Sequence, residues 1–234
     1  MAQSQEQGGN RTTFAYIDGY NLYNGIVDKR NHMPGVLTES PFRQFLWLDL
    51  DKLVRHFLPE EFTLARIRYF TSPERGDPVK ADRQAVYLRA IETIPSLSYG
   101  LGRFTMRSLP NYSAPIRFVR WFLGDLRPKY TEKETDVALA VQAFRDVVYE
   151  KELESVVLIS GDSDFAPLLK AIKAERPKIF IRVIFPPGRK SDYLGDLADD
   201  SHKIGYKVLS ASQLPDPVIG LDGSPIYKPS LWTI

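Results

Sequence analysis

The sequence contains no cysteine among its 234 residues, and this absence excludes several kinds of chemistry at once. Disulfide bridges, thiolate zinc sites and cysteine nucleophiles are all ruled out. Histidine is scarce as well, since the chain holds only His32, His56 and His202, which are far apart in the sequence. Their spacing does not suggest a histidine metal site. Any metal site in this chain is therefore expected to use oxygen ligands.

Long apolar segments are also missing. No apolar run approaches the ~20 residues needed to cross a membrane, and the first ten residues are polar, with no apolar leader region. The sequence has neither a Walker loop nor a Gly-x-Gly-x-x-Gly motif, which disfavours enzymes built on a nucleotide cofactor. We therefore expect a soluble, cytoplasmic protein without a membrane partner.

Neither sign of charge dominates, because the net charge is +2. The distribution is uneven, however: residues 62–133 hold 13 Lys or Arg and only 6 Asp or Glu, which leaves the rest of the chain acidic. A basic segment beside an acidic site suits a protein that contacts a nucleic-acid backbone and binds metal. A solvated basic surface would explain the distribution equally well.

Apolar strand-like runs alternate with amphipathic helical patterns along the chain. Strands are expected at 13–17, 62–70, 99–107, 116–122, 156–160, 179–185 and 206–209, with a hairpin around Pro110 and Asn111. Helices are expected at 20–26, 42–57, 79–94, 136–149, 164–174 and 194–204, and 136–149 has Val137, Val141, Phe144 and Val148 on one face. The alternation predicts an α/β fold with a mostly parallel central sheet and helices on both faces.

One domain of residues 12–212 accounts for all of these elements. Residues 1–11 have the composition of a disordered tail, and residues 213–234 form an arm rich in proline and glycine. The sequence allows a homo-oligomer and gives no pattern that requires one.

Three acidic stretches stand at informative places. Asp18 follows the strand 13–17, Asp162 and Asp164 follow the strand 156–160, and Asp136 opens a helix. Ligands of an open parallel sheet bind beyond the carboxyl ends of the strands, where the strand order reverses. If the two strands are neighbours there, we expect these acids to converge. Clustered carboxylates cannot all stay ionised without a cation, and a hard divalent ion would resolve the repulsion.

Each acid also has an ordinary structural explanation. Asp18 fits a simple strand exit, Asp162 and Asp164 fit helix caps, and Asp136 fits an exposed first turn. The functional interpretation depends on the occurrence of all these acids together at strand ends and helix starts, with adjacent glycines that permit close approach of the backbone.

The segments Phe14–Asn21, Glu132–Ala140 and Leu158–Leu168 resemble the NYN domain, a branch of the PIN-like nucleases, and most closely its LabA-like group. The resemblance spans almost the whole predicted domain, and its third segment is highly specific. It implies a PIN-like (Rossmannoid) fold and a ribonuclease that depends on Mg²⁺ or Mn²⁺.

The same resemblance assigns roles to single residues. Asp18, Asp136 and Asp162 match the metal-binding acids of the family, Asp164 matches a further acid, and Asn21 matches the polar residue that orients the first acid. One departure is visible, because residues 133–135 read Lys-Glu-Thr where the family often has Lys-Gly.

Candidate RNA contacts come from the basic segment and from aromatic residues. The candidate phosphate contacts on the helix at 79–94 are Lys80, Arg83 and Arg89, and those farther along the basic segment include Arg117, Arg120 and Lys133. Tyr20, Tyr23, Tyr112 and Trp121 could stack on bases, which favours single-stranded RNA, although most such residues pack in cores.

Two other functions compete with the ribonuclease. An RNA-binding or regulatory NYN module would keep the fold and the acids with little or no catalysis. A phosphatase of the haloacid-dehalogenase type also has an aspartate at a strand end, but it needs a second acid two residues later. That position is Tyr20 in this sequence.

Overall fold

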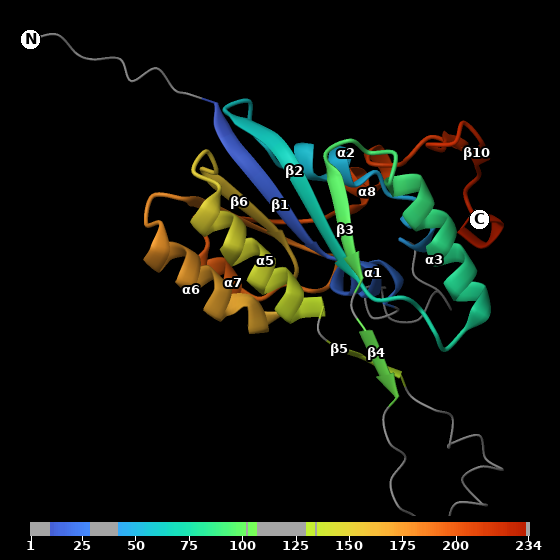
Figure 1. The fold of residues 1–234 in the computed structure, drawn as a ribbon, viewed down its shortest axis with the longest axis horizontal. Coiled ribbons are helices and arrows are strands. Elements are labelled where there is room, and N and C mark those ends of the chain that lie inside the picture. Colours follow the sequence, from blue (N-terminus) through green and yellow to red (C-terminus); the bar gives the residue numbers. More distant parts are fainter. Residues whose placement is uncertain (1–9, 29–41, 102, 107–129, 134, 233–234) are drawn as a thin grey trace, which may run out of the picture.

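The computed structural model describes residues 10–28, 42–101, 103–106, 130–133 and 135–232. Within these ranges a six-stranded parallel sheet has the strand order β3-β2-β1-β6-β7-β8, and helices lie on both of its faces (Figure 1). The predicted α/β class and the parallel sheet are confirmed. No helix in the described ranges combines the length and the hydrophobicity needed to cross a membrane.

The sheet strands are β1 (Arg11–Asp18), β2 (Phe62–Thr71), β3 (Leu97–Leu101), β6 (Ser155–Ile159), β7 (Phe180–Phe185) and β8 (Asp200–Lys203). The α-helices are α1 (Gly19–Val27), α2 (Leu50–Arg55), α3 (Pro78–Ile91), α5 (Thr135–Tyr149), α6 (Ala166–Glu175), α7 (Asp192–Leu197) and α8 (Tyr206–Ala211). In the described ranges, the short 3-10 helices are η2 (Arg43–Phe45), η3 (Ser163–Phe165) and η4 (Ser230–Trp232). Small antiparallel pairs in the same ranges join β4 (Arg103–Met106) to β5 (Tyr130–Lys133) and β9 (Val218–Ile219) to β10 (Pro225–Ile226).

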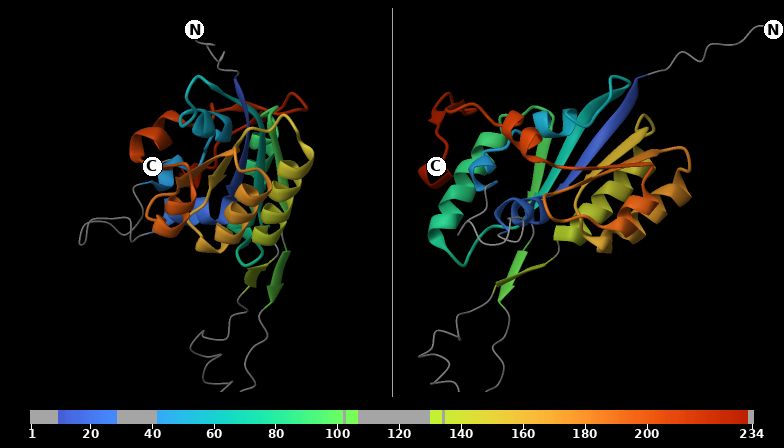
Figure 2. Two further views of the ribbon diagram at one scale, coloured as in Figure 1. Left: turned by 90° about the vertical axis from the view of Figure 1, so that its left-hand side faces the viewer. Right: turned by 180° about the vertical axis from the view of Figure 1, so that it is seen from behind.

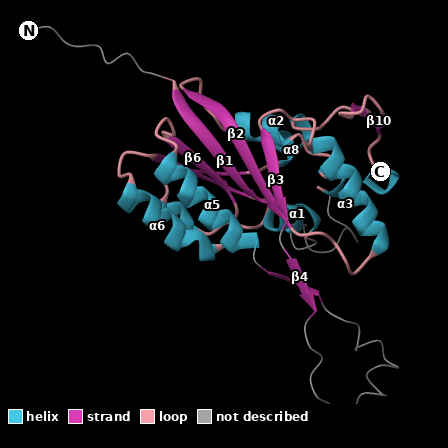
Figure 3. Ribbon diagram, in the orientation of Figure 1, coloured by secondary structure: helices cyan, strands magenta, loops and turns pink. Residues whose placement is uncertain are grey.

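The central strands are buried on both sides, and successive residues face opposite sides of the sheet. Ala15 and Ile17 of β1 pack with residues of α1, α2, α3 and α8. Phe14 and Tyr16 pack with residues of α5, α6 and α7. The two helical layers are seen from other directions in Figure 2 and by element type in Figure 3.

The single helix predicted for residues 42–57 is wrong. The segment forms η2, an extended stretch in which Leu48 bridges to Gln213, and then α2. Asp49 interrupts the helix, because its Oδ1 accepts hydrogen bonds from the N–H groups of Asp51 and Lys52 and so caps the start of α2. The local capping bonds outweigh the helical periodicity of the longer segment.

The last two secondary-structure elements of the predicted domain also differ from the prediction. The helix expected at 194–204 stops at Leu197, and Asp200–Lys203 forms the edge strand β8 beside β7. The strand expected at 206–209 is the helix α8, in which Val208 and Leu209 are buried. In a short apolar run, the periodicity of the sequence does not distinguish a strand from a buried helical turn.

The apolar face predicted for the helix at 136–149 is the exposed face. Val137 and Val141 are 66% and 62% exposed, whereas Leu139 is fully buried. The buried face carries a second apolar stripe of Leu139, Ala143 and Val147. Asp146 lies on the same side, where the Tyr16 hydroxyl donates to its Oδ2 at 2.9 Å, and both side chains are buried. Burial, together with the Asp146 charge, raises the pKa of Tyr16, so this hydroxyl stays a neutral donor.

The predicted hairpin around Pro110 and Asn111 cannot be compared directly, because residues 107–129, including the strand expected at 116–122, lie outside the described residues. The partner of β4 is β5, with Arg103 opposite Lys133, and the sequence did not suggest this strand.

The segment 213–234, as far as residue 232, carries β9, β10 and η4. Trp232 is 6% exposed, and its ring centroid lies 6.3 Å from that of Trp47.

Candidate active site

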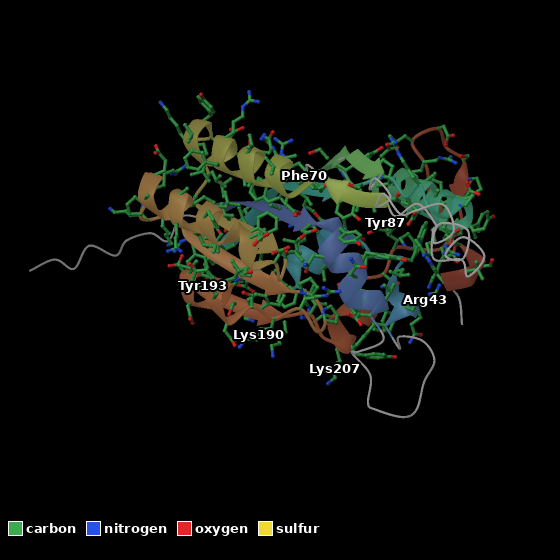
Figure 4. The ribbon with its side chains drawn as sticks, turned by 90° about the horizontal axis from the view of Figure 1, so that it is seen from below. Arg43, Phe70, Tyr87, Lys190, Tyr193 and Lys207 are labelled. Atoms are coloured by element: carbon green, nitrogen blue, oxygen red, sulfur yellow. The ribbon has the colours of Figure 1, made fainter. Side chains whose placement is uncertain are left out.

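The strand order of the sheet reverses between β1 and β6, which are parallel neighbours. From β1 the sheet continues through β2 to β3, and from β6 it continues in the opposite direction through β7 to β8. The predicted adjacency of these two strands is therefore confirmed. A ligand of such a sheet binds beyond the carboxyl ends of the strands at this point, and Figure 4 views the molecule from this edge.

Asp18 ends β1 as a buried carboxylate that is 3% exposed. Its Oδ1 accepts a hydrogen bond from the backbone N–H of Asn21 at 2.9 Å, which caps α1. Its Oδ2 accepts from Ser160 Oγ at 2.9 Å, which ties the end of β1 to the end of β6. The Asp18 carboxylate therefore caps α1 and also links β1 to β6 at the switch point of the sheet.

The loops that follow β1 and β6 are joined by further hydrogen bonds. The N–H of Gly161 donates to Asn21 Oδ1 at 3.0 Å, and the N–H of Asp162 donates to Ser160 Oγ at 3.1 Å. A Cβ atom on Gly161 would lie 1.6 Å from the carbonyl oxygen of Arg189. The close approach of two backbones at this position therefore requires glycine.

Asp162 and Asp164 lie between β6 and α6. Asp162 Oδ1 accepts from the N–H of Asp164 at 3.0 Å and caps η3. Asp162 Oδ2 accepts no hydrogen bond from the residues that the structure describes. Asp162 is partly exposed and Asp164 is exposed, so one carboxylate oxygen of Asp162 can cap the helix while the other faces a ligand.

Asp136 lies in the first turn of α5, where its side chain is exposed. The neighbouring Thr135 is buried, and its Oγ1 lies 2.7 Å from Ser72 Oγ, just past the carboxyl end of β2. This contact holds the start of α5 at the same edge as Asp18. Across the described ranges, no group of three or more His, Cys, Asp or Glu side chains is placed to hold a metal ion. Shared ligation of one ion by Asp18, Asp136 and Asp162 therefore stays a prediction.

Two of the predicted phosphate contacts lie beside this edge. Lys80 and Arg83, three residues apart on α3, both line a pocket to which Tyr20 and Tyr23 of α1 also contribute. Residues three apart are neighbours on a helix surface, and these two cations line the same pocket.

The predicted contacts farther along the basic segment cannot be placed. Arg117 and Arg120, like the aromatic residues Tyr112 and Trp121, lie outside the described residues. Lys133 ends β5, where only its backbone is described.

Sequence reasoning missed most of the pocket. Tyr87 from α3 and Trp232 from η4 contribute aromatic rings to its lining. Gln84 fixes the loop at its edge, because its Nε2 donates to the Ser72 carbonyl at 2.8 Å and its Oε1 accepts from the N–H of Glu74 at 2.7 Å. These contacts are non-local, so no spacing pattern in the sequence could have revealed them. The arm 213–234 holds apolar residues such as Val218, Ile226 and Trp232, but they form no periodic pattern that indicates where the arm packs.

Comparison with known proteins gives three findings. The family model of the NYN domain matches residues 16–205. The chain is 28% identical to a Pseudomonas putida protein named 6-hydroxy-3-succinoylpyridine 3-monooxygenase, over 94% of this chain and 75% of that protein. It is also similar to a Vibrio parahaemolyticus protein of unknown function whose crystal structure is known. The TM-score is 0.52 at 16% identity, over 88% of this chain and 98% of that chain. That likeness concerns the fold alone.

Proposed function

The chain belongs to the NYN domain family of the PIN-like nuclease superfamily, and on this basis we propose that it is a metal-dependent ribonuclease that hydrolyses phosphodiester bonds of RNA. The reaction would take place at the carboxyl edge of β1 and β6. The supporting observation is the hydrogen-bonded link from Asp18 through Ser160 to Asp162 across the switch point of the sheet. Such a link fixes two acids where a parallel sheet binds its ligands.

The side chains at this edge fit a hard divalent ion. All of the donors are oxygens, and Mg²⁺ is usually held by one or two carboxylates together with waters and substrate phosphates. Asp18 and the second oxygen of Asp162 would supply the protein ligands, and Asp136 would contribute from the start of α5. A bound Mg²⁺ or Mn²⁺ would neutralise charge on the phosphate and lower the pKa of an attacking water.

The protein's own groups serve to position this site. Ser160 donates to Asp18 and accepts from the N–H of Asp162, so one hydroxyl fixes both acids. Asn21 accepts from the N–H of Gly161 and keeps the two loops together. Groups that hold metal ligands in place typically contribute about 10- to 100-fold to metal affinity or activity. Asp164 is exposed next to these groups and would face the substrate.

The first test is a calorimetric titration with Mn²⁺ followed by a cleavage assay on single-stranded RNA. We expect metal binding at the acidic edge, cleavage that requires the added ion, and no cleavage in EDTA. If the chain binds RNA tightly and takes up Mn²⁺ but leaves the RNA intact, the regulatory module without catalysis is the correct description.

RNA affinity is expected to depend on the two basic residues of the pocket. The double variant Lys80→Ala, Arg83→Ala should weaken binding of single-stranded RNA in EDTA for all sequences alike. For a single strand, each cation that stops neutralising a phosphate flattens the slope of log affinity against log salt by about 0.7, so removal of both should flatten it by about 1.4.

Arg89→Ala provides the matched control, because Arg89 is on the same helix but does not line the pocket. Its ion pair with Asp222 spans 3.9 Å at the surface. The control should leave affinity and slope unchanged. Unchanged affinity and slope in the double variant would place the RNA path elsewhere on the basic segment.

A second candidate function follows from the name of the Pseudomonas putida relative, 6-hydroxy-3-succinoylpyridine 3-monooxygenase. One observation favours it: the pocket beside the acidic edge combines aromatic rings with Lys80 and Arg83, which would suit a pyridine ring that carries a carboxylate. Oxygen uptake by the full chain with that pyridine and an added electron donor tests it. Uptake that depends on the pyridine would favour the monooxygenase, and its absence would remove this candidate.

A further inference from the structure

The pocket between α1 and α3 has a volume of about 110 Å³ and an aromatic inner wall. Tyr69, Tyr87 and Trp232 are each less than a tenth exposed. The Tyr87 ring is close to perpendicular to the rings of Tyr69 and Trp232, with centroid separations of 6.5 and 6.1 Å. Its hydroxyl donates to the Leu48 carbonyl at 3.0 Å, so its polar end is satisfied inside the protein. Figure 4 labels Tyr87 on this side of the molecule.

The outer part of the pocket is polar, and its lining holds the cations Lys80 and Arg83 as well as the acid Glu74. Tyr20 is 50% exposed and Tyr23 is 36% exposed, so both rings are accessible to a ligand. Arg83 makes no hydrogen bond or ion pair with the residues that the structure describes. Among the described residues, the ammonium group of Lys80 has one ionic contact, at 3.9 Å from Asp77, and such a surface pair holds a lysine weakly. Both cations can therefore turn to an anionic ligand.

The pocket adjoins the proposed catalytic edge at two points. Gly19 lines it and directly follows Asp18. Ser72 lines it as well, and its hydroxyl contacts Thr135, the residue before Asp136. An anion held by Arg83 would thus lie in a pocket that adjoins the acids of the proposed site.

The size of the pocket limits its occupant. A cavity of roughly 150 Å³ binds a benzene molecule, and the pocket encloses about 110 Å³, so its size is closer to that of a single ring than to that of two fused rings. A purine has two fused rings and would fit less well. The wall suits a flat ring, because bases stack on aromatic side chains, and the guanidinium of Arg83 suits a phosphate, which it can contact through two parallel hydrogen bonds.

We propose that this pocket binds a single-ring heteroaromatic group with a neighbouring anion, and that its occupant is a pyrimidine nucleotide of the RNA substrate. The assignment rests on the proposed ribonuclease function and extends it from backbone contacts to selection of a base next to the cleaved bond. A free hydroxypyridine carboxylate shares the same chemistry and is the other source of such a ligand.

The test is calorimetry of the full chain in EDTA, where cleavage does not interfere, with uridine 5′-monophosphate (UMP) as the probe. We expect UMP to bind, uridine to bind at least tenfold more weakly because it lacks the phosphate, and adenosine 5′-monophosphate to bind at least fivefold more weakly. Arg83→Ala should weaken UMP binding at least tenfold, in line with removal of hydrogen bonds between charged groups. Tyr23→Ala should weaken it about fivefold, because one stacking ring is removed.

Arg89→Ala is the matched control and should change UMP affinity by less than twofold, with all variants melting at the temperature of the unchanged protein. Absence of UMP binding, equal binding of UMP and uridine, or unchanged affinity in Arg83→Ala would overturn the proposal. Tighter binding of 6-hydroxynicotinate than of UMP would overturn the nucleotide assignment. Retained UMP binding without any RNA cleavage would count against the ribonuclease alone, so the two failures can be told apart.

Discussion

Asp18→Asn is expected to abolish metal-dependent RNA cleavage while leaving the fold and its stability almost unchanged. Mutation of groups that only orient metal ligands costs about 10- to 100-fold, so loss of a ligand should lower cleavage by roughly 100-fold or more. Asparagine caps helices about as well as aspartate, and it can still accept the N–H of Asn21. Its amide group can donate to Ser160, whose hydroxyl oxygen has two lone pairs. Loss of one negative charge also reduces repulsion among the acids.

The measurement is cleavage of a labelled single-stranded RNA with saturating Mn²⁺, beside a thermal melt without metal. Asp162→Asn should behave in the same way. Glu60→Gln is the control, because it removes one exposed charge just before β2, at the opposite edge of the sheet. A clear fall in melting temperature for both aspartate variants without metal would show that these acids act as structural caps. Full cleavage by Asp18→Asn would exclude its role as a ligand.

Gly161→Ala is expected to lower the melting temperature by about 5–10 °C. The added Cβ would lie 1.6 Å from the backbone carbonyl oxygen of Arg189, so one of the two loops must move. Overpacking of this kind typically costs about 1–3 kcal/mol or more, and 1 kcal/mol shifts the melting temperature of a protein of this size by about 2–4 °C. Movement of the loop would also break the bond from the N–H of Gly161 to Asn21, so cleavage should fall with stability.

Gly195→Ala is the matched control for the same chemical change. Gly195 lies inside α7, and a Cβ there would meet its nearest atom, Ser201 Oγ, at 3.6 Å, an ordinary contact. Alanine is preferred over glycine inside helices by roughly 0.5–1 kcal/mol, so this variant should hold or raise the melting temperature. Equal melting temperatures for Gly161→Ala and the unchanged protein would mean that the two loops have room to separate.

The parts of the fold that the sequence predicted are those with strong local signals. β1 and β6 are apolar runs followed by Asp18 and by Ser160, and α3 begins with proline after a capping aspartate, Asp77. The errors arise where a local cap or packing against the rest of the fold overrides the periodic pattern. Asp49 caps a new helix inside a periodic segment, and α5 buries Leu139, Ala143 and Val147 in place of the valine face that the sequence pattern favoured.

The candidate site likewise has parts that the sequence could predict and parts that it could not. The position of Asp18 beside the loop of Asp162 followed from strand ends and from the topology of parallel sheets, so the sequence could predict it. The hydroxyl of Ser160 between them could be suspected from its place in the motif, but not its two hydrogen bonds. The pocket that includes Trp232 depends on the C-terminal arm packing against Trp47 and Tyr87, and no local pattern predicts that contact.

A crystal structure of the full chain soaked in Mn²⁺ would decide whether the acidic edge is a metal site, because Mn²⁺ is located by its anomalous scattering. We predict a peak at the carboxyl edge of β1 and β6, within direct ligand distance of Asp18 or Asp162 and with Asp136 bound to it directly or through a water. The opposite result is a structure at saturating Mn²⁺ with no peak at this edge, in which Asp18 and Asp162 keep only their capping hydrogen bonds and Asp136 points into solvent. That result would contradict the proposed metal-dependent ribonuclease.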